Sequence, residues 1–395
     1  MTPGRHVANQ DTLALPAVDL RALARRAALP GALAVVAVVA FVVAGGPTQA
    51  FADALDRALD ADPRWIAAAI VFELLSFVGY VVLLWLVGRR ATRRLGLRES
   101  TEVSLGGAAA TRLLPTGGVG GAALTIWAFR RAGLDSQAAT RTLLAFLFVL
   151  YSVFLASIAV AGGLLALGIA PGGGPLALTA IPAIGAVLVM AGALALAARH
   201  PAREDRVTAA APGASRLARA RAVLNHVPAA VNGAVRDAVT LVRSGDPRLL
   251  GAVAWWAFDA AVMWSMLHAL GAPPSLAVIV LAYFVGQVAN TVPIPGAASG
   301  GMVGVLLAFG VEADLALASV LAYRSVAIWL PAPLGLVALG GLHKTFARWA
   351  EEDASMQQDA SMQAPAAAPV LTPRPEPVRR PVLPVPEPVA AQVAA

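Results

Sequence analysis

Two acidic side chains stand inside long apolar stretches of this chain, where ionisable groups are rare. Glu73 lies in the stretch 65–88, and Asp259 lies in the stretch 250–270. At such a depth in a membrane an ionisable side chain is costly, so it faces protein or water rather than lipid. We predict that both acids bind a cation or a proton. The alternative is a structural hydrogen bond to a neighbouring helix.

Arg324 is a basic side chain in a comparable position, inside the apolar stretch 315–342. Its planar guanidinium can donate two parallel hydrogen bonds to a phosphate, so we predict that it binds one. The alternative is an ion pair with Asp259 or Glu73 that holds the helices together.

Two breaks rich in proline, glycine and other small residues interrupt the apolar sequence, at 114–121 (LPTGGVGG) and 292–301 (VPIPGAASGG). Glycine permits backbone geometry that is closed to other residues, and free amides at the start of a following half-helix suit an anion. A seam of small residues that packs helices is the alternative. The predicted substrate-binding residues are Arg112, Gly117, Gly118, Gly120, Gly121, Gln287, Asn290, Gly296, Gly300, Gly301 and Arg324.

No catalytic motif accompanies these residues. The sequence has neither a Walker-type phosphate loop nor a Gly-x-Ser-x-Gly elbow, and it has no Cys and five scattered His. We therefore expect no enzymatic activity, no cofactor and no metal. The net charge of +7 comes largely from arginines beside apolar stretches, which argues against nucleic acid as a partner.

The elements that position these residues are membrane helices. Hydrophobic residues make up 58% of the chain and charged residues 13%, against about 25% charged in soluble domains. We predict an all-α integral membrane protein with about six full spans and two re-entrant segments that contain the breaks. The predicted spans cover about 30–47, 65–88, 142–167, 176–198, 250–270 and 315–342. A cleaved signal peptide is the alternative for 30–47, although the long basic region before it favours an uncleaved span.

Arginine placement sets the expected orientation. Arginines at 89–98 and in the loop 199–247 predict that these segments, and both termini, are cytoplasmic. The re-entrant segment 99–131 has basic flanks and should open inward, whereas 275–310 has none and should open outward. Together with the correspondence of Phe72-Glu73 to Phe258-Asp259, this predicts an inverted repeat, as in many transporters. The alternative is that 275–310 crosses the membrane twice.

Three regions follow from this pattern. Residues 1–29 form a cytoplasmic segment, and 30–345 form the membrane domain with its cytoplasmic loop. Residues 346–395 are a Pro/Ala-rich tail, which we expect to be disordered.

The two breaks, taken with Arg130-Arg131-Ala132-Gly133-Leu134, Tyr323-Arg324 and Trp329-Leu330-Pro331, resemble the flippase-like family related to the transmembrane region of lysylphosphatidylglycerol synthase. The resemblance covers roughly 30–345 and implies a polytopic inner-membrane protein that moves, or helps move, lipids between leaflets. Many relatives carry a Glu beside each glycine block, where this chain has Ala122, Ala123, Ala298 and Ser299. No aminoacyl-transferase domain follows, so we expect no synthesis of lysyl-lipid.

We therefore expect translocation of a phospholipid or a lipid-linked headgroup, with membrane lipids as partners and the cell (inner) membrane as location. The sequence names no protein partner. Two other functions fit the same pattern. One is secondary transport of a small solute, and the other is a non-transporting membrane scaffold for envelope assembly.

Overall fold

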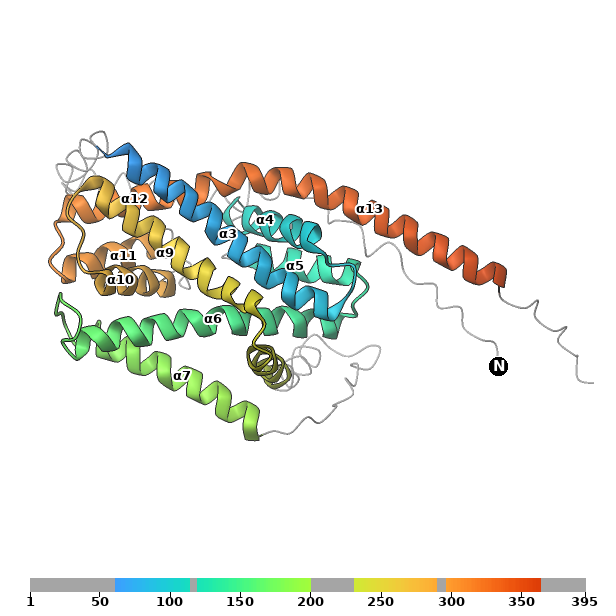
Figure 1. Ribbon diagram of the computed structural model, residues 1–395, viewed down its shortest axis with the longest axis horizontal. Coiled ribbons are helices and arrows are strands. Elements are labelled where there is room, and N and C mark those ends of the chain that lie inside the picture. Colours follow the sequence, from blue (N-terminus) through green and yellow to red (C-terminus); the bar gives the residue numbers. More distant parts are fainter. Residues whose placement is uncertain (1–60, 114–118, 200–230, 290–295, 364–395) are drawn as a thin grey trace, which may run out of the picture. The chain divides into compact units, whose positions relative to one another are not determined.

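The computed structural model describes residues 61–113, 119–199, 231–289 and 296–363 (Figure 1). These ranges contain helices and no strand, which confirms the all-α class. Residues 231–243 are helical. The other helices, in chain order, are α3 (Pro63–Ala91), α4 (Leu97–Leu113), α5 (Val119–Arg131), α6 (Ser136–Ala166), α7 (Ala180–Arg199), the one-turn 3-10 helix η2 (Pro247–Leu249), α9 (Leu250–Leu270), α10 (Leu276–Ala289), α11 (Ala297–Ala308), α12 (Ala313–Trp329) and α13 (Pro331–Gln363).

The described residues contain five stretches long and apolar enough to cross a membrane, and each overlaps a predicted span. They are Pro63–Ala91, Ser136–Ala166, Ala180–Ala198, Pro247–Leu270 and Ala313–Asp359. The predicted span at 30–47 lies outside the described residues. On α7 large apolar side chains such as Ile181, Ile184 and Leu188 are exposed. A continuous exposed apolar face of this kind marks contact with a membrane.

Four shorter helices occupy the segments predicted to be re-entrant. The pair α4 and α5 lies in the first segment, and the pair α10 and α11 in the second. Helices of 12 to 17 residues are about 18–26 Å long at 1.5 Å per residue, less than the ~30 Å hydrocarbon core. The first part of each predicted break, 114–118 and 292–295, lies outside the described residues, and the last part, 119–121 and 296–301, lies at the start of α5 and of α11.

The long helices α3 and α9 form the centre of the bundle and run antiparallel (Figure 1). At one end the backbone amide of Asp62 donates a hydrogen bond to the carbonyl of Ala269 at 3.0 Å. Near the middle the rings of Phe72 and Phe258 stack, with their centroids 5.8 Å apart. The two residues predicted to correspond in the repeat therefore contact each other.

Glycine allows the same two helices to approach closely where α9 begins. A Cβ atom placed on Gly79 would lie 2.7 Å from the carbonyl oxygen of Gly251 and 2.7 Å from the amide nitrogen of Trp255. Backbone atoms cannot move away as a flexible side chain can, so a larger residue would push the helices apart. The Ser76 hydroxyl adds a hydrogen bond to the Trp255 carbonyl at 3.0 Å.

The remaining helices repeat one order along the chain. After α3 come two short helices that pack on each other, α4 and α5, and then the long helix α6. After α9 come α10 and α11, which pack on each other, and then α12. In addition, α6 packs against α10, and α12 packs against α9. These helices therefore surround α9, the second of the two central helices.

Among the described residues, those up to Phe346 form one compact unit, and those from Ala347 onward form a second. Helix α13 extends to Gln363, so residues 347–363, predicted as part of a disordered tail, are helical. Glu, Gln, Ala and Met dominate this segment, and all four are strong helix formers. Arg348 and Glu352 also pair across one turn at 3.8 Å.

Candidate functional site

The carboxylate of Asp259 is held inside the bundle by two tyrosines. Asp259 lies in α9 and is 4% exposed. The Tyr283 hydroxyl of α10 donates to Asp259 Oδ2 at 2.5 Å, and the Tyr323 hydroxyl of α12 donates to Oδ1 at 3.2 Å. Each carboxylate oxygen thus accepts a hydrogen bond from a different helix. Both tyrosines are fully buried.

Gln287 extends this arrangement by one further hydrogen bond. It lies one turn after Tyr283 on α10, so both side chains face the same side of that helix. Its Nε2 donates to the Tyr323 hydroxyl at 3.3 Å. Asp259, Tyr283, Tyr323 and Gln287 are named here the Asp259 cluster. Hydrogen bonds in such a buried chain polarise and strengthen one another.

Aromatic packing fixes the hydroxyl groups in place. The Tyr283 ring meets the ring of Tyr323 at a centroid distance of 6.0 Å and that of Phe284 at 4.8 Å. On the α6 side, Trp256 donates its Nε1 hydrogen bond to the Leu150 carbonyl at 2.8 Å. A buried carboxylate is tolerated only with hydrogen-bonding partners. The packing of these rings stabilises the site because it holds the tyrosine hydroxyl donors in position toward Asp259.

Glu73, the other predicted acid, is also buried within the bundle, at 1% exposure in α3. It follows Phe72 directly, just as Asp259 follows Phe258, and those two rings stack on each other. The two acids therefore flank one contact at the centre of the antiparallel pair α3 and α9. Chemically, each can hold a proton or a cation in a region that excludes bulk water.

Arg324 belongs to α12 next to Tyr323, but it does not join the Asp259 cluster. Successive residues on a helix are about 100° apart, so a residue beside the inward-pointing Tyr323 faces a different direction. Arg324 is accordingly only partly buried. Within the described part of the chain, no ion pair connects it to Asp259 or to Glu73. The ion pair that was the alternative to phosphate binding is therefore not formed among the described residues, and phosphate binding by Arg324 stays a prediction.

Gly121 and Gly301, two of the predicted binding glycines, serve close helix packing. The Gly121 amide donates to the Thr111 hydroxyl at 2.9 Å, and a Cβ atom there would lie 2.8 Å from the Gly107 carbonyl oxygen. A Cβ atom on Gly301 would lie 2.9 Å from the Ala289 Cβ atom. These contacts join α4 to α5 and α10 to α11, as expected for a small-residue seam.

Two other predicted binding glycines, Gly296 and Gly300, lie at the start of α11. Gly296 is the N-cap of that helix with φ of +81°, a left-handed conformation that favours glycine. Among the residues that the structure describes, a Cβ atom on Gly296 or Gly300 would meet nothing within 4 Å. Gly120 lies in the first turn of α5. Gly117, Gly118, Asn290 and the side chain of Arg112 lie outside the described residues.

Sequence reasoning did not assign a role to Tyr283, and it used Tyr323 only as the residue before Arg324. A usable signal was present, because the chain has only four tyrosines and Tyr283 precedes Gln287 by one helical turn.

A metal site would require several acidic or histidine side chains close together. In the part of the chain that the structure describes, no three His, Cys, Asp or Glu side chains are grouped to hold a metal ion.

Comparison with known protein families supplies one match. The family model described as the lysylphosphatidylglycerol synthase TM region matches residues 28–335. No curated protein sequence matches the chain. The matched range begins before α3 and ends in the first turns of α13, so it contains the entire Asp259 cluster.

Proposed function

Because this chain belongs to the family of the lysylphosphatidylglycerol synthase transmembrane region, we propose that it moves a phospholipid or a lipid-linked headgroup between membrane leaflets. The family and the five apolar helices make it a multi-pass membrane protein associated with lipid biosynthesis or translocation. Translocation is the more specific proposal, and it rests on the site inside the bundle.

The observation that carries the proposal is the buried Asp259 cluster. An ionisable residue inside membrane helices is costly to place there, and such residues mark substrate, ion or proton pathways. The cluster collects donors from α10 and α12 around a carboxylate of α9, so it couples three helices to one ionisable group. A change in the charge of that group therefore acts on the packing of all three helices.

An inverted repeat would supply the alternating access that translocation needs. Three features support it: the antiparallel course of α3 and α9, the repeated helix order, and the contact of Phe72 with Phe258. Equivalent residues near a two-fold axis contact each other in this way. The short helix pairs α4–α5 and α10–α11 then become the two re-entrant segments, opening to opposite sides.

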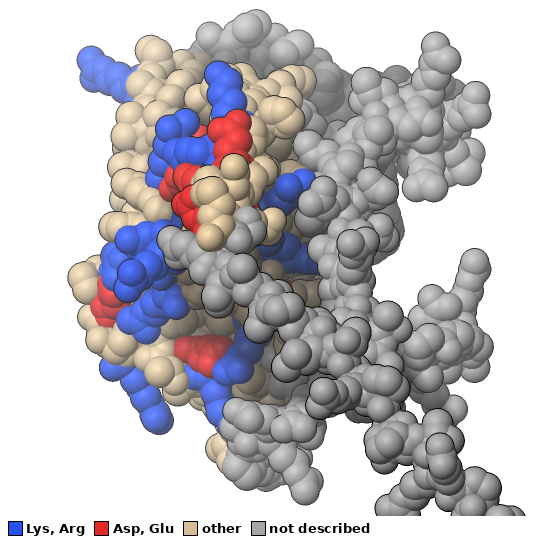
Figure 2. Space-filling model, turned by 90° about the vertical axis from the view of Figure 1, so that its right-hand side faces the viewer, with Lys and Arg blue, Asp and Glu red and all other residues tan. Residues whose placement is uncertain are grey.

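Arginines give the proposed orientation. Helix α3 ends with Arg89 and Arg90, and α5 ends with Arg130 and Arg131. Figure 2 shows Lys and Arg side chains gathered on the side of the molecule toward which these helix ends lie in Figure 1. Because basic residues favour the cytoplasmic side, we place this side in the cytoplasm and the protein in the cell membrane.

In the proposed mechanism the headgroup passes between the two broken segments while the acyl chains stay on the apolar, lipid-facing side of the helices. Asp259 and Glu73 hold a proton or a cation, and Arg324, together with Arg112, contacts phosphate. A planar guanidinium suits that contact because it donates two parallel hydrogen bonds. The chain itself forms no covalent intermediate with the lipid.

Lipid flux in proteoliposomes tests this function. Wild-type protein should exchange a fluorescent phospholipid between leaflets faster than protein-free vesicles do. The Asp259→Ala and Arg324→Ala variants should each be slower than wild type. Equal flux with and without protein would contradict translocation, and unchanged flux in the two variants would remove the roles given to these residues.

A further inference from the structure

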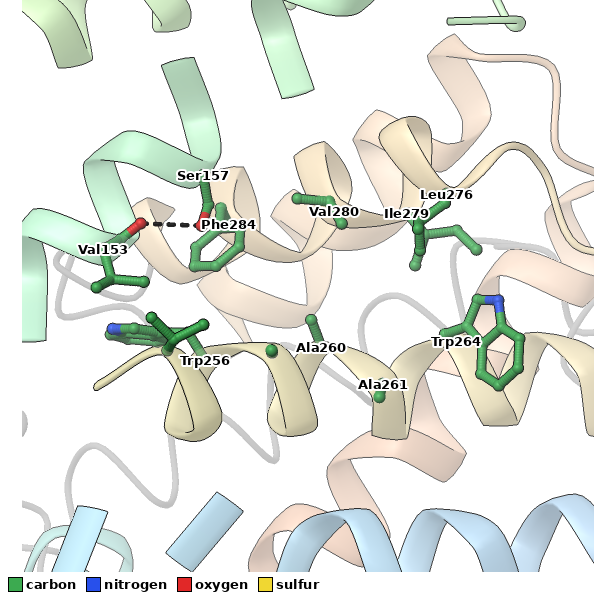
Figure 3. Close-up of a pocket in the computed structure, with 12 residues that line it drawn as sticks. Val153, Ser157, Trp256, Ala260, Ala261, Trp264, Leu276, Ile279, Val280 and Phe284 are labelled. Carbon is green, nitrogen blue, oxygen red and sulfur yellow. Dashed lines mark hydrogen bonds between the residues drawn. The ribbon is translucent and has the colours of Figure 1, made fainter. Parts of the chain in front are cut away.

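An apolar groove opens on the bundle beside the Asp259 cluster. It lies between α6, α9 and α10 and has a volume of about 270 Å³ (Figure 3). The α9 residues that line it share one helix face, and α6 and α10 form its walls. The lining residues are Val153, Ser157, Val253, Trp256, Ala257, Ala260, Ala261, Trp264, Leu276, Ile279, Val280 and Phe284.

The polar atoms of this lining are largely occupied within the protein. The Ser157 hydroxyl donates to the Val153 carbonyl of its own helix at 2.9 Å, as the dashed line in Figure 3 shows. The Trp256 indole donates to the Leu150 carbonyl at 2.8 Å. The third polar side chain, Trp264, stands at the end of the groove near Leu276 (Figure 3). The middle of the groove thus offers hydrocarbon surface and few hydrogen-bonding groups.

The length and volume of the groove match one hydrocarbon chain. Val253 and Trp264 bound it along α9, and they are about 17 Å apart at 1.5 Å per residue. That length is roughly half of the ~30 Å hydrocarbon core. The volume lies just below the ~300–1,000 Å³ of typical small-molecule sites, so it has room for a chain but not for an entire lipid.

Two aromatic rings connect the groove to the buried carboxylate. Ala260 lines the groove and is the residue after Asp259, and Phe284 lines it and is the residue after Tyr283. The Phe284 ring contacts the Tyr283 ring at a centroid distance of 4.8 Å, and Tyr283 donates to Asp259. Anything seated in the groove therefore packs against rings that position the Asp259 donors.

We propose that this groove holds one acyl chain of the translocated phospholipid, beside the Asp259 cluster. This proposal rests on the proposed translocation and extends it, because it names the part of the lipid that the protein holds. The chain occupies the groove at the depth of the carboxylate, and the rings of Phe284 and Trp256 are its contact surface. The site accordingly recognises a hydrocarbon chain rather than a free headgroup.

Photo-crosslinking tests the groove independently of flux. The probe is phosphatidylglycerol with a diazirine in the middle of one acyl chain, reconstituted with the full chain in vesicles. We expect the label on peptides that contain groove residues of α6, α9 and α10, above the level on the exposed face of α7. Labelling that is uniform over all lipid-facing helices would overturn the proposal.

The Ala257→Trp variant fills the groove, and Ala191→Trp is its matched control. Both alanines are exposed, Ala257 in the groove and Ala191 on α7, so neither substitution requires the core to repack. Displacing about two methylenes from the groove corresponds to a loss of labelling of roughly tenfold. We expect this loss for Ala257→Trp and no change for Ala191→Trp. Equal groove labelling in the two variants would contradict the site.

Flux measured on the same vesicles separates the two proposals. In one outcome, wild-type protein gives no flux but its groove is labelled, and Ala257→Trp abolishes that labelling. This outcome would refute translocation and support the acyl-chain site. In the other outcome, wild-type protein gives flux, and Ala257→Trp changes neither the flux nor the labelling. This outcome would refute acyl-chain binding in the groove but not translocation.

Discussion

Removal of the Tyr283 hydroxyl is the sharpest test of how the buried carboxylate is held. The Tyr283→Phe substitution keeps the ring, and with it the contacts to Phe284 and Tyr323, but it deletes the hydrogen bond of 2.5 Å to Asp259. Hydrogen bonds to a charged group contribute about 1.5–3 kcal/mol, and this donor is fully buried, so water cannot replace it. We expect a loss of stability of about that size.

The assay is thermal unfolding of the purified protein in detergent, followed by intrinsic tryptophan fluorescence. A loss of about 1.5–3 kcal/mol corresponds to a fall in the unfolding midpoint of roughly 5 °C. Tyr151→Phe is the matched control, because Tyr151 is 49% exposed on α6 and surface changes are usually within about 0.5 kcal/mol. Equal midpoints for Tyr283→Phe and Tyr151→Phe would refute the view that Tyr283 holds the carboxylate.

Two other predictions concern helix packing and pH. Gly79→Leu should prevent close approach of α3 to Gly251 and abolish folded protein on size-exclusion chromatography. Gly185→Leu is the control, because a Cβ atom there would meet nothing within 4 Å among the described residues, and this variant should stay folded. Folded protein for both variants would contradict the close packing of α3 on α9. At the end of the loop before η2, the side-chain hydrogen bond from Arg248 lowers the pKa of Asp246 from 3.8 to about 2. A lowered pKa of this carboxyl stabilises the folded state above about pH 4. In thermal unfolding, the difference in stability between wild type and Asp246→Asn should therefore disappear as the pH falls from about 4 through 2. A difference that stays constant over this range would contradict the pairing of Asp246 with Arg248.

Hydropathy predicted the long helices well because it depends on the local sequence alone. The lengths of α3, α6, α7 and α9 follow from runs of apolar residues, and a 30 Å core requires such runs. The burial of Glu73 and Asp259 followed in the same way, since each acid stands within one of these runs. Sequence position alone was enough for both conclusions.

The partners of those acids depend on tertiary structure, and the sequence could not specify them. Tyr283 and Tyr323 reach Asp259 from two different helices, 24 and 64 residues away along the chain. For the same reason the sequence could not show that the Gly121 amide donates to the Thr111 hydroxyl or that Arg324 is only partly buried. Residues 347–363 illustrate another limit, because low-complexity composition indicated disorder where strong helix formers give a helix.

The central claim is that the Asp259 carboxylate is part of a lipid pathway. Its most direct test is the initial rate of phospholipid exchange between leaflets in proteoliposomes that contain the Asp259→Asn variant. This change keeps the shape of the side chain and removes its charge. Asp237→Asn is the control, since Asp237 pairs with Arg141 and is exposed. We expect a fall of about tenfold or more, equivalent to about 1.4 kcal/mol, for Asp259→Asn alone. Equal rates for wild type, Asp259→Asn and Asp237→Asn would contradict it.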